Sequence, residues 1–308
     1  MIEGDEYDSA FFDKTAKFLK YLPDVAVVGN LEFDHADIYA DFEAIRSAVR
    51  RLVALLPQRG LLVLGADNPA ALEMREDAPC RVMTFGLTEA AEWRATRVEP
   101  APDSTRFVVE HRGQRVADLR VPLVGEFNVR NALAAFAVAT DAGLDAATII
   151  ASVGRFEGVR RRLELRGRAR GVSVYDDFAH HPTAVRETLA GVRAAFPSRR
   201  IWALFEPRSA TSCRRVFQED FAGAFTVADE VIIGRVYRSS LPEGERLSED
   251  ELVVGICATG VRARYLGEVG DIVRVLVDEA REEDLVVVMS NGAFGGIHGR
   301  LLEALAGR

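Results

Sequence analysis

The sequence predicts an α/β protein built from two sheet domains. Its 308 residues, 48% of them hydrophobic, are enough to form two cores of ordinary size. Short apolar segments alternate with segments of helical periodicity in both halves of the chain, which favours mostly parallel sheets covered by helices. A middle region of shorter, alternating strands interrupts this pattern and predicts an antiparallel extension of the first sheet.

Residues 1–157 form the first predicted domain. Val25–Val28 is apolar throughout and mostly β-branched, as buried parallel strands tend to be. A helix begins after Asp41, because apolar residues then recur at helical spacing until Pro57 and Gly60 end it. The other elements expected here are a strand end at Met1–Glu3, a partly helical segment at Phe11–Tyr21, strands at Leu61–Leu64 and Arg81–Phe85, and a short helix at Asn68–Glu76.

The antiparallel extension precedes two further helices of this domain. Its expected strands are Trp93–Val98, Thr105–Val109 and Gln114–Leu119, with turn residues between them. The first helix covers Val129–Ala142, and Asp145 is a suitable N-cap for the second.

Residues 158–308 form the second predicted domain, of the Rossmann-like, doubly wound type. The joint between the domains is placed in Phe156–Arg170, which is rich in arginine and glycine. The elements expected after it are strand Val172–Tyr175, a helix from Thr183, strand Ile201–Phe205, a helix ending at Phe225, strand Glu230–Ile233, helix 248–255, a strand near Arg264, helix 269–282, strand Leu285–Met289 and a final helix.

Composition narrows the class of partner. The net charge of -8 and the pI near 5.3 argue against general binding to nucleic acid or to an anionic membrane. No apolar run approaches the ~18 residues of a membrane span, and the acidic N-terminus is unlike a signal peptide. The three cysteines are far apart and odd in number, which fits a reducing cytoplasm.

The segment Asn30–Tyr39 is the first candidate for a functional site, because it follows the end of a predicted strand. It carries four ionisable residues, Glu32, Asp34, His35 and Asp37. A second acidic cluster, Glu3, Asp5, Glu6 and Asp8, precedes it. Carboxylates with an imidazole suit Mg²⁺ or Mn²⁺. The equally weighted alternative is a solvated loop whose acids cap the following helix.

The second predicted domain has candidate segments at its joint and strand ends. Arg160–Arg162 suits a polyphosphate, with a solvated hinge as the alternative. Tyr175–Pro182 places two acids and a histidine pair between a strand and a helix. Glu206–Thr211 offers Arg208 to a carboxylate. The glycine-rich Ser290–Gly296 is either an ordinary tight turn or a loop that presents N–H groups to an anion.

Seven strings in this order resemble the Mur ligases: IEGDEYD, NLEFDHADIY, GEFNVRNALAA, FEGVRRRLE, YDDFAHHPTAV, FEPRSAT and SNGAFGGIH. The resemblance implies a central ATPase-type domain followed by a Rossmann-like C-terminal domain. It also implies ATP-dependent amide formation with Mg²⁺ or Mn²⁺, in which a carboxylate becomes an acyl phosphate and an amine then displaces phosphate. FEPRSAT, SNGAFGGIH and EYDSAFFDK are most similar to members that join UDP-N-acetylmuramate to the tripeptide L-Ala-γ-D-Glu-meso-diaminopimelate in peptidoglycan recycling.

The resemblance also implies residue roles. Glu3 and His35 match metal-site positions, and both are expected to serve catalysis together with Arg162. Asn128 and Asn131 match the pair beside adenine, while Arg162 and Asp177 match positions at the phosphates and the nucleotide. His180, His181 and Arg208 fall where the family binds the incoming amino acid or peptide.

Two family features have no counterpart in the sequence. No glycine-rich loop ending in G-K-T/S occurs, since no lysine follows Lys20, and no UDP-binding N-terminal domain precedes the first motif. We therefore expect a chain that starts within the central domain and is inactive alone. A separate N-terminal half, a truncated gene or a shortened polypeptide would each explain this. The sequence also leaves open a non-catalytic nucleotide- or peptide-binding module, or another Mur-type ligase such as the UDP-N-acetylmuramate–L-alanine or a polyglutamate-adding enzyme.

Overall fold

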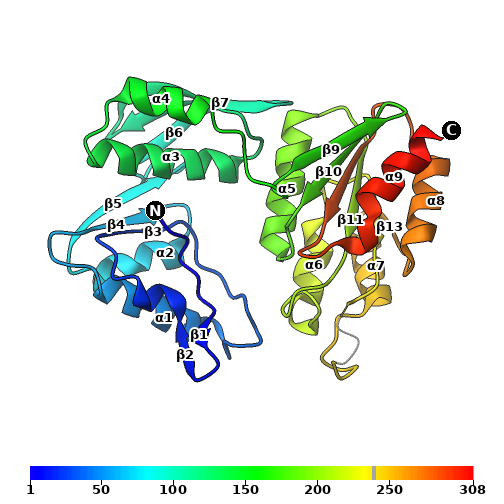
Figure 1. Cartoon of the computed structure of the whole chain (residues 1–308), viewed down its shortest axis with the longest axis horizontal. Helices are drawn as coiled ribbons and strands as arrows, with labels where there is room; N and C mark the ends of the chain where they lie inside the picture. Colours follow the sequence, from blue (N-terminus) through cyan, green and yellow to red (C-terminus); the bar gives the residue numbers. More distant parts are fainter. Residues whose placement is uncertain (238–240, 308) are drawn as a thin grey trace. The chain divides into compact units, whose positions relative to one another are not determined.

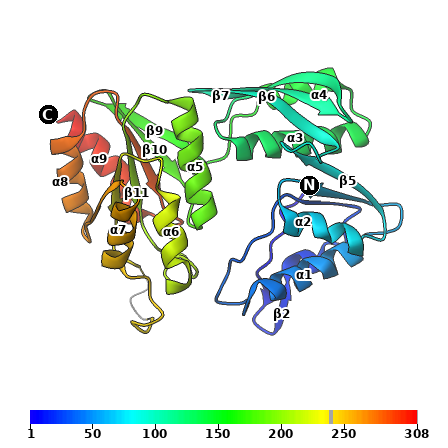
Figure 2. The same cartoon turned by 180° about the vertical axis from the view of Figure 1, so that it is seen from behind.

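The structure, a computed structural model, describes residues 1–237 and 241–307 and divides into two compact units. The first unit comprises Met1–Glu99 and Ser104–Phe156. The second comprises the residues from Glu157 onward together with Pro100–Asp103, the end of a strand and the turn that follows it. Each unit contains a six-stranded sheet with helices packed on it (Figures 1 and 2), so the predicted α/β fold class is confirmed.

The first unit begins with a small hairpin and continues into the larger sheet, ordered β3-β4-β5-β6-β7-β8. Strands β3 to β6 run parallel and β7 pairs antiparallel with β8, as the change in sequence pattern predicts. Its elements are β1 (Asp8–Ala10), β2 (Asp13–Ala16), η1 (Lys17–Lys20), β3 (Val25–Val28), α1 (Phe42–Ala54), β4 (Leu61–Gly65), α2 (Pro69–Glu73), η2 (Met74–Asp77), β5 (Arg81–Gly86), β6 (Trp93–Ala101), β7 (Ser104–His111), β8 (Gln114–Val121), α3 (Glu126–Asp141) and α4 (Ala146–Gly154).

Alternate residues of this sheet enter two different cores. Leu61 and Val63 of β4 pack with α3 and α4, whereas Leu62 and Leu64 pack with α1 and α2. This period of two follows from the pleat of a strand, and it explains why β4 is apolar at every position. At the end of the sheet, β3 buries only one face, since Val25 and Val27 on the other are 42% and 49% exposed.

The second unit is a doubly wound sheet ordered β13-β12-β11-β14-β10-β9. Its first five strands in this order run parallel, and only β9 is antiparallel, to β10. Its elements are β9 (Glu164–Ala169), β10 (Val172–Asp177), α5 (Pro182–Ala195), β11 (Ile201–Phe205), η3 (Arg215–Phe217), α6 (Gln218–Ala224), β12 (Glu230–Ile233), α7 (Glu249–Ala258), β13 (Arg262–Tyr265), α8 (Val269–Glu279), β14 (Leu285–Met289), η4 (Phe294–Gly296) and α9 (Ile297–Ala306).

The strand order places the switch point of this sheet at β14, which lies between β10 and β11. Helices α8 and α9 cover one face, where they meet Val174, Leu204 and Val288, and α5 and α6 lie on the opposite face (Figures 1 and 2). Asp177, Phe205 and Met289 end their strands in register. An open α/β sheet binds ligands at this kind of carboxyl edge.

One local expectation was wrong, since Met1–Glu3 has no regular structure. Two elements were not predicted. The first is the β1–β2 hairpin at Asp8–Ala16. The second is β9 over Glu164–Ala169, within the segment Phe156–Arg170 where the joint was placed. The sequence pattern missed this strand because charged residues occupy several of its positions, which an exposed edge strand tolerates. Within residues 1–237 and 241–307, every helix is too short or too polar to traverse a bilayer.

Candidate functional site

The loop after β3 is fixed by the loop after β4. A Cβ at Gly65 would lie 1.9 Å from the carbonyl oxygen of Gly29, so the two backbones approach as closely as glycine permits. The Asn68 side chain accepts hydrogen bonds from the N–H groups of Ala71 (2.8 Å) and Leu31 (3.3 Å). Asn68 therefore caps α2 and also holds the start of the acidic segment 30–39 at the carboxyl edge of the sheet.

His35 is the most constrained residue of that segment. Its φ of 54° lies in the left-handed region, which is uncommon for a residue with a side chain and often marks a functional loop. Its Nε2 contacts the Glu6 carboxylate and lies 3.9 Å from Asp34 Oδ2, while its ring packs edge-on against Tyr7. The imidazole therefore joins the two acidic clusters that the sequence singled out.

The pKa of His35 lies above its ordinary value. Burial is the largest influence and lowers it, but the Glu6 hydrogen bond and the charges of Asp34 and Asp37 outweigh burial. A raised pKa in the folded state means that protonated His35 stabilises the first unit at low pH, and that this stabilisation is lost as pH rises through the raised value.

We therefore expect the His35 imidazole to titrate above 6.5 in metal-free buffer, and Glu6→Gln to lower its pKa. An NMR titration of the ring protons measures both values. Glu76→Gln, at an exposed position on η2, is the matched control and leaves the titration unchanged. A Glu6→Gln pKa equal to that of the unaltered chain would contradict the assigned contact.

The donor types around His35 suit a hard divalent cation, but they do not form a closed metal site. Within the described part of the chain, no three His, Cys, Asp or Glu side chains are grouped so that they could hold a metal ion. Glu3 is exposed in the irregular N-terminal segment, and the contacts of His35 are instead with Glu6 and Asp34. A metal held here would take part of its ligand shell from a bound phosphate or from water.

Helix α3 carries the expected adenine-side pair, but its two members differ in environment. Asn128 is buried and donates from Nδ2 to the Val124 carbonyl oxygen (2.8 Å), while Asn131 is exposed one turn later. Between them Arg130 donates from Nε to Asp67 (2.8 Å), a residue that the sequence patterns did not single out. Asp67 also accepts from the N–H groups of Leu87 and Thr88, so it ties α3 to the ends of β4 and β5.

The second unit gathers its candidate residues at the carboxyl edge, around Asp177. This buried carboxylate accepts hydrogen bonds from the N–H groups of Leu163 (2.7 Å) and Ala179 (2.8 Å) and from the Thr188 hydroxyl (3.2 Å). Burial raises the pKa of Asp177, and the hydrogen bonds oppose the rise. Oδ2 accepts the bond from Leu163, and Oδ1 accepts those from Ala179 and Thr188. Asp177 therefore fixes the arginine segment Arg160–Arg162 to the end of β10.

A buried ion cluster lies beside it. The neighbouring Asp176 is 3.3 Å from His298 Nε2 and 3.6 Å from Arg161 Nε. Burial, the largest influence, raises the pKa of Asp176, but His298 and Arg161 together bring it below its ordinary value. Arg161 also donates to the carbonyl oxygens of Ser290 and Gly292, so it links the arginine segment to the glycine-rich loop.

The other predicted residues lie around this cluster. Arg162 is exposed, and its guanidinium sits 5.3 Å from the centre of the Phe178 ring. His180 contacts the Phe178 carbonyl oxygen through Nδ1 at 2.9 Å. His181 caps α5, because its Nδ1 accepts from the Thr183 N–H (3.3 Å), and its ring packs edge-on against Phe217. A structural role therefore accounts for His181, while Arg162 presents its charge at the surface.

Arg208 is held by the loops that end three neighbouring strands. Its guanidinium lies 3.7 Å from the centre of the Tyr237 ring and 3.8 Å from Glu206. Glu206 accepts a 2.6 Å hydrogen bond from the buried Ser290 hydroxyl. A Cβ at Gly292 would lie 2.0 Å from Arg208 Nε, so the glycine leaves the space that this side chain occupies. The arrangement presents one oriented cation at the switch point.

Sequence reasoning missed Asp67, Arg130 and His298 as parts of these clusters, whereas Arg161 lies within the candidate segment Arg160–Arg162. His298 ends the SNGAFGGIH string, and Arg130 lies inside GEFNVRNALAA, so position within a recognised string was the available signal. Asp67 had no such signal, because its partners are brought to it by strand pairing.

Comparison with known proteins gives two family matches. Residues 6–139 match the Mur ligase middle domain, and residues 161–292 match the domain described as Mur ligase, glutamate ligase domain.

Individual relatives extend the match to nearly the whole chain. A UDP-N-acetylmuramate--L-alanyl-gamma-D-glutamyl-meso-2,6-diaminoheptandioate ligase of Escherichia coli K12 is 39% identical over 307 residues, which is 99% of this chain and 65% of that protein. A UDP-N-acetylmuramate--L-alanine ligase of Desulfitobacterium hafniense is 30% identical over 291 residues, covering 94% and 64% respectively. A murein peptide ligase structure from Psychrobacter arcticus superposes with a TM-score of 0.68 and 33% identity, covering 100% of this chain and 62% of that one. The chain thus spans 62% to 65% of these relatives' lengths.

Proposed function

The chain belongs to the Mur ligase family, and we propose that it forms the middle and C-terminal parts of an ATP-dependent ligase that joins UDP-N-acetylmuramate to L-Ala-γ-D-Glu-meso-diaminopimelate in cytoplasmic peptidoglycan recycling. The observation that carries this proposal is the 39% identity, over 99% of the chain, to a ligase named for the tripeptide. Identity to six named alanine ligases is lower, at 30% to 34%.

Arg208 supports an acceptor that carries a carboxylate, as both the tripeptide and L-alanine do. A guanidinium stacked on Tyr237 and flanked by Glu206 is oriented to donate two parallel hydrogen bonds to a carboxylate of the peptide. His180, exposed in part on the same edge, would contribute a polar contact, and His181 would set the start of α5 beside it.

The remaining roles are proposed residue by residue from the family resemblance. We propose that Asn128 and Asn131 contact adenine, that Arg162 contacts the phosphates, and that Asp177 positions Arg162 through the Leu163 N–H. Glu3 and His35 would hold Mg²⁺ or Mn²⁺, in concert with the nucleotide's own phosphates. ATP would supply the phosphoryl group that converts the muramyl carboxylate into an acyl phosphate, whose phosphate the peptide amine displaces.

The acceptor assignment is testable with the chain as it exists. We expect calorimetry to detect binding of the tripeptide, and Arg208→Ala to weaken it about tenfold or more, because a charge-assisted hydrogen bond contributes ~1.5–3 kcal/mol. Arg215→Ala, which removes an exposed arginine paired with Glu251, is the control and leaves binding unchanged. Tighter binding of L-alanine than of tripeptide would instead favour the alanine ligase.

Turnover requires a separate test. The chain is mixed with an N-terminal polypeptide that supplies the part of the Escherichia coli relative it does not match, and phosphate release is followed with ATP, Mg²⁺, UDP-N-acetylmuramate and tripeptide. We expect release only when both polypeptides are present. Turnover by the chain alone would contradict the expected inactivity.

A binding module is the second candidate, and the match of residues 161–292 to a Mur ligase domain favours affinity for nucleotide or peptide. Binding of tripeptide or ATP with no turnover in the mixture would support this candidate.

A further inference from the structure

A cavity of about 530 Å³ lies at the amino-terminal edge of the second unit's sheet. Five arginines line it, from the turn before β10, the start of β11, strand β13 and the loop after α8. They are Arg170, Arg200, Arg262, Arg264 and Arg281. The cavity volume falls within the ~300–1,000 Å³ range of small-molecule sites.

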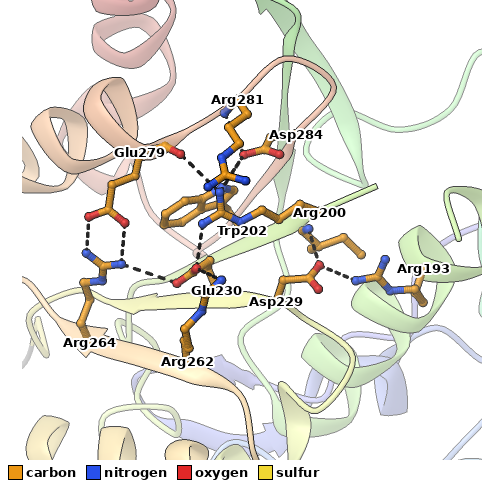
Figure 3. A network of polar contacts seen from close by, with 11 residues as sticks. Arg193, Arg200, Trp202, Asp229, Glu230, Arg262, Arg264, Glu279, Arg281 and Asp284 are labelled. Carbon is orange, nitrogen blue, oxygen red and sulfur yellow. Dashed lines mark hydrogen bonds and ion pairs between the residues drawn. The ribbon is translucent and has the colours of Figure 1, made fainter. Parts of the chain in front are cut away.

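The arginines are arranged around one buried carboxylate, that of Glu230, which is 2% exposed. Arg200 lies 2.7 Å from it, Arg264 lies 3.5 Å from it, and Arg262, its register partner on β13, also contacts it (Figure 3). Arg264 additionally pairs with both oxygens of Glu279, at 2.7 and 2.8 Å. This network orients the guanidiniums of Arg200, Arg262 and Arg264 in the cavity wall.

Positive charge is in excess in the cavity. Its lining contains five guanidiniums but only three carboxylates, those of Glu230, Asp278 and Glu279. Asp284 is not part of this lining but lies 3.6 Å from Arg200. When its carboxylate is counted as well, the local excess falls from two positive charges to one. A cavity with fixed excess charge and partly buried walls attracts an anion more strongly than an open surface does.

Two of the arginines retain donors that the network does not use. Arg170 donates to the carbonyl oxygens of Val277 (3.2 Å) and Ala280 (2.8 Å), which orient its guanidinium without neutralising it. Arg262 is 72% exposed and reaches Glu230 through Nη2. A guanidinium has five N–H groups in a planar fork, so both side chains can still bind an oxyanion.

This cavity is distinct from the candidate functional site. Glu230 and Arg262 begin their parallel strands, whereas Asp177, Glu206 and Ser290 lie at or just beyond the ends of theirs. The cavity and the switch-point cluster therefore lie at opposite edges of one sheet.

We propose that the cavity binds a phosphate group, as free phosphate or as a small phosphate monoester, through Arg170, Arg262 and Arg281. A phosphate monoester carries about -1.5 to -2 charges near pH 7, opposite in sign to the local excess of one to two positive charges, and its oxygens accept paired N–H donors from arginine. The bound phosphate connects edge strand β13 to the end of α8. Because these groups come together only in the folded unit, phosphate binding stabilises the second unit against unfolding.

Trp202 provides a direct probe of this site. Its ring lies 4.5 Å from the Arg200 guanidinium and 5.9 Å from that of Arg264, and its Nε1 donates to Asp284 (Figure 3). The chain has two tryptophans, so Trp93→Phe leaves Trp202 as the sole emitter. Inorganic phosphate and glycerol 3-phosphate are titrated separately into this variant, with NaCl adjusted to constant ionic strength. We expect a saturable change in Trp202 emission and a higher melting temperature of the second unit.

Two substitutions in the lining and one outside it complete the test. Arg281→Ala and Arg262→Gln weaken phosphate binding at least fivefold, whereas Arg274→Ala, on the exposed side of α8 and paired with Asp271, leaves it unchanged. Tighter binding of glycerol 3-phosphate identifies a monoester site, equal binding identifies a site that contacts only the phosphate group, and weaker binding identifies a site for free phosphate. A response to both anions that does not saturate, or an equal loss in Arg274→Ala, overturns the proposal and leaves the arginines a purely structural role.

Discussion

Replacing Gly65 with alanine is expected to lower the free energy of unfolding of the first unit by about 3 kcal/mol. The new Cβ would meet the Gly29 carbonyl oxygen at 1.9 Å and its carbon at 2.9 Å, and both are backbone atoms that cannot rotate away. Either the end of β4 or the loop after β3 must therefore move. Because that loop leads to His35, the substitution would also disturb the proposed metal ligand.

The measurement follows Trp93 emission during urea unfolding in a Trp202→Phe background, so that only the first unit is observed. Gly154→Ala is the matched control in the same unit, since nothing lies within 4 Å of the added carbon and the residue ends helix α4. We expect the control to change stability by no more than about 1 kcal/mol. Equal losses in the two variants would contradict the assigned close approach.

Replacing Asp177 with alanine is expected to destabilise the second unit by about 3 kcal/mol or more. The Leu163 and Ala179 N–H groups and the Thr188 hydroxyl would each lose an acceptor, at a position where water has little access. Asp177→Asn keeps the volume and one acceptor oxygen, so it should fall between the alanine variant and the unaltered chain. The amide NH₂ group of this variant would face the N–H and O–H groups that donate to the Asp177 carboxylate, so one donor would oppose another.

Trp202 emission in the Trp93→Phe variant reports this unfolding. Asp271→Ala is the control, because Asp271 pairs with Arg274 at the exposed surface of α8 and such helix pairs contribute ~0.5 kcal/mol or less. If Asp177→Ala were no more destabilising than Asp271→Ala, the three hydrogen bonds could not hold the arginine segment. If its effect were large, the assignment of Arg162 to the phosphates would gain a structural basis.

The local elements of the fold were predictable where burial and periodicity coincide. The apolar segments that became β4, β11, β12 and β14 are buried parallel strands, and such strands are apolar at nearly every position. The equally apolar Val25–Val28 forms the expected parallel strand β3, but it buries only one face. The antiparallel extension was predictable from its shorter alternating strands. In contrast, β9 was hidden, because an edge strand with exposed arginines has no apolar period to detect.

The site was predictable as a set of segments but not as a set of contacts. Asn30–Tyr39, Tyr175–Pro182, Glu206–Thr211 and Ser290–Gly296 lie at carboxyl ends of parallel strands, as strand-end position implies. The partners of individual side chains were not predictable. His35 meets Glu6, Asp176 meets His298, and Arg208 lies over Tyr237, in each case across a turn of the fold that no local pattern describes.

The amino-acid sequence by itself determined the α/β class and the family resemblance, because periodicity, strand-end chemistry and motif order are properties of neighbouring residues. Only the tertiary structure decided which charges meet. Strand order brings Asp177 level with Met289 and Phe205 at one edge, and brings Glu230 beside Arg262 at the other. These pairings depend on register between distant segments, so the switch-point cluster and the arginine-lined cavity become evident only once the sheet has formed.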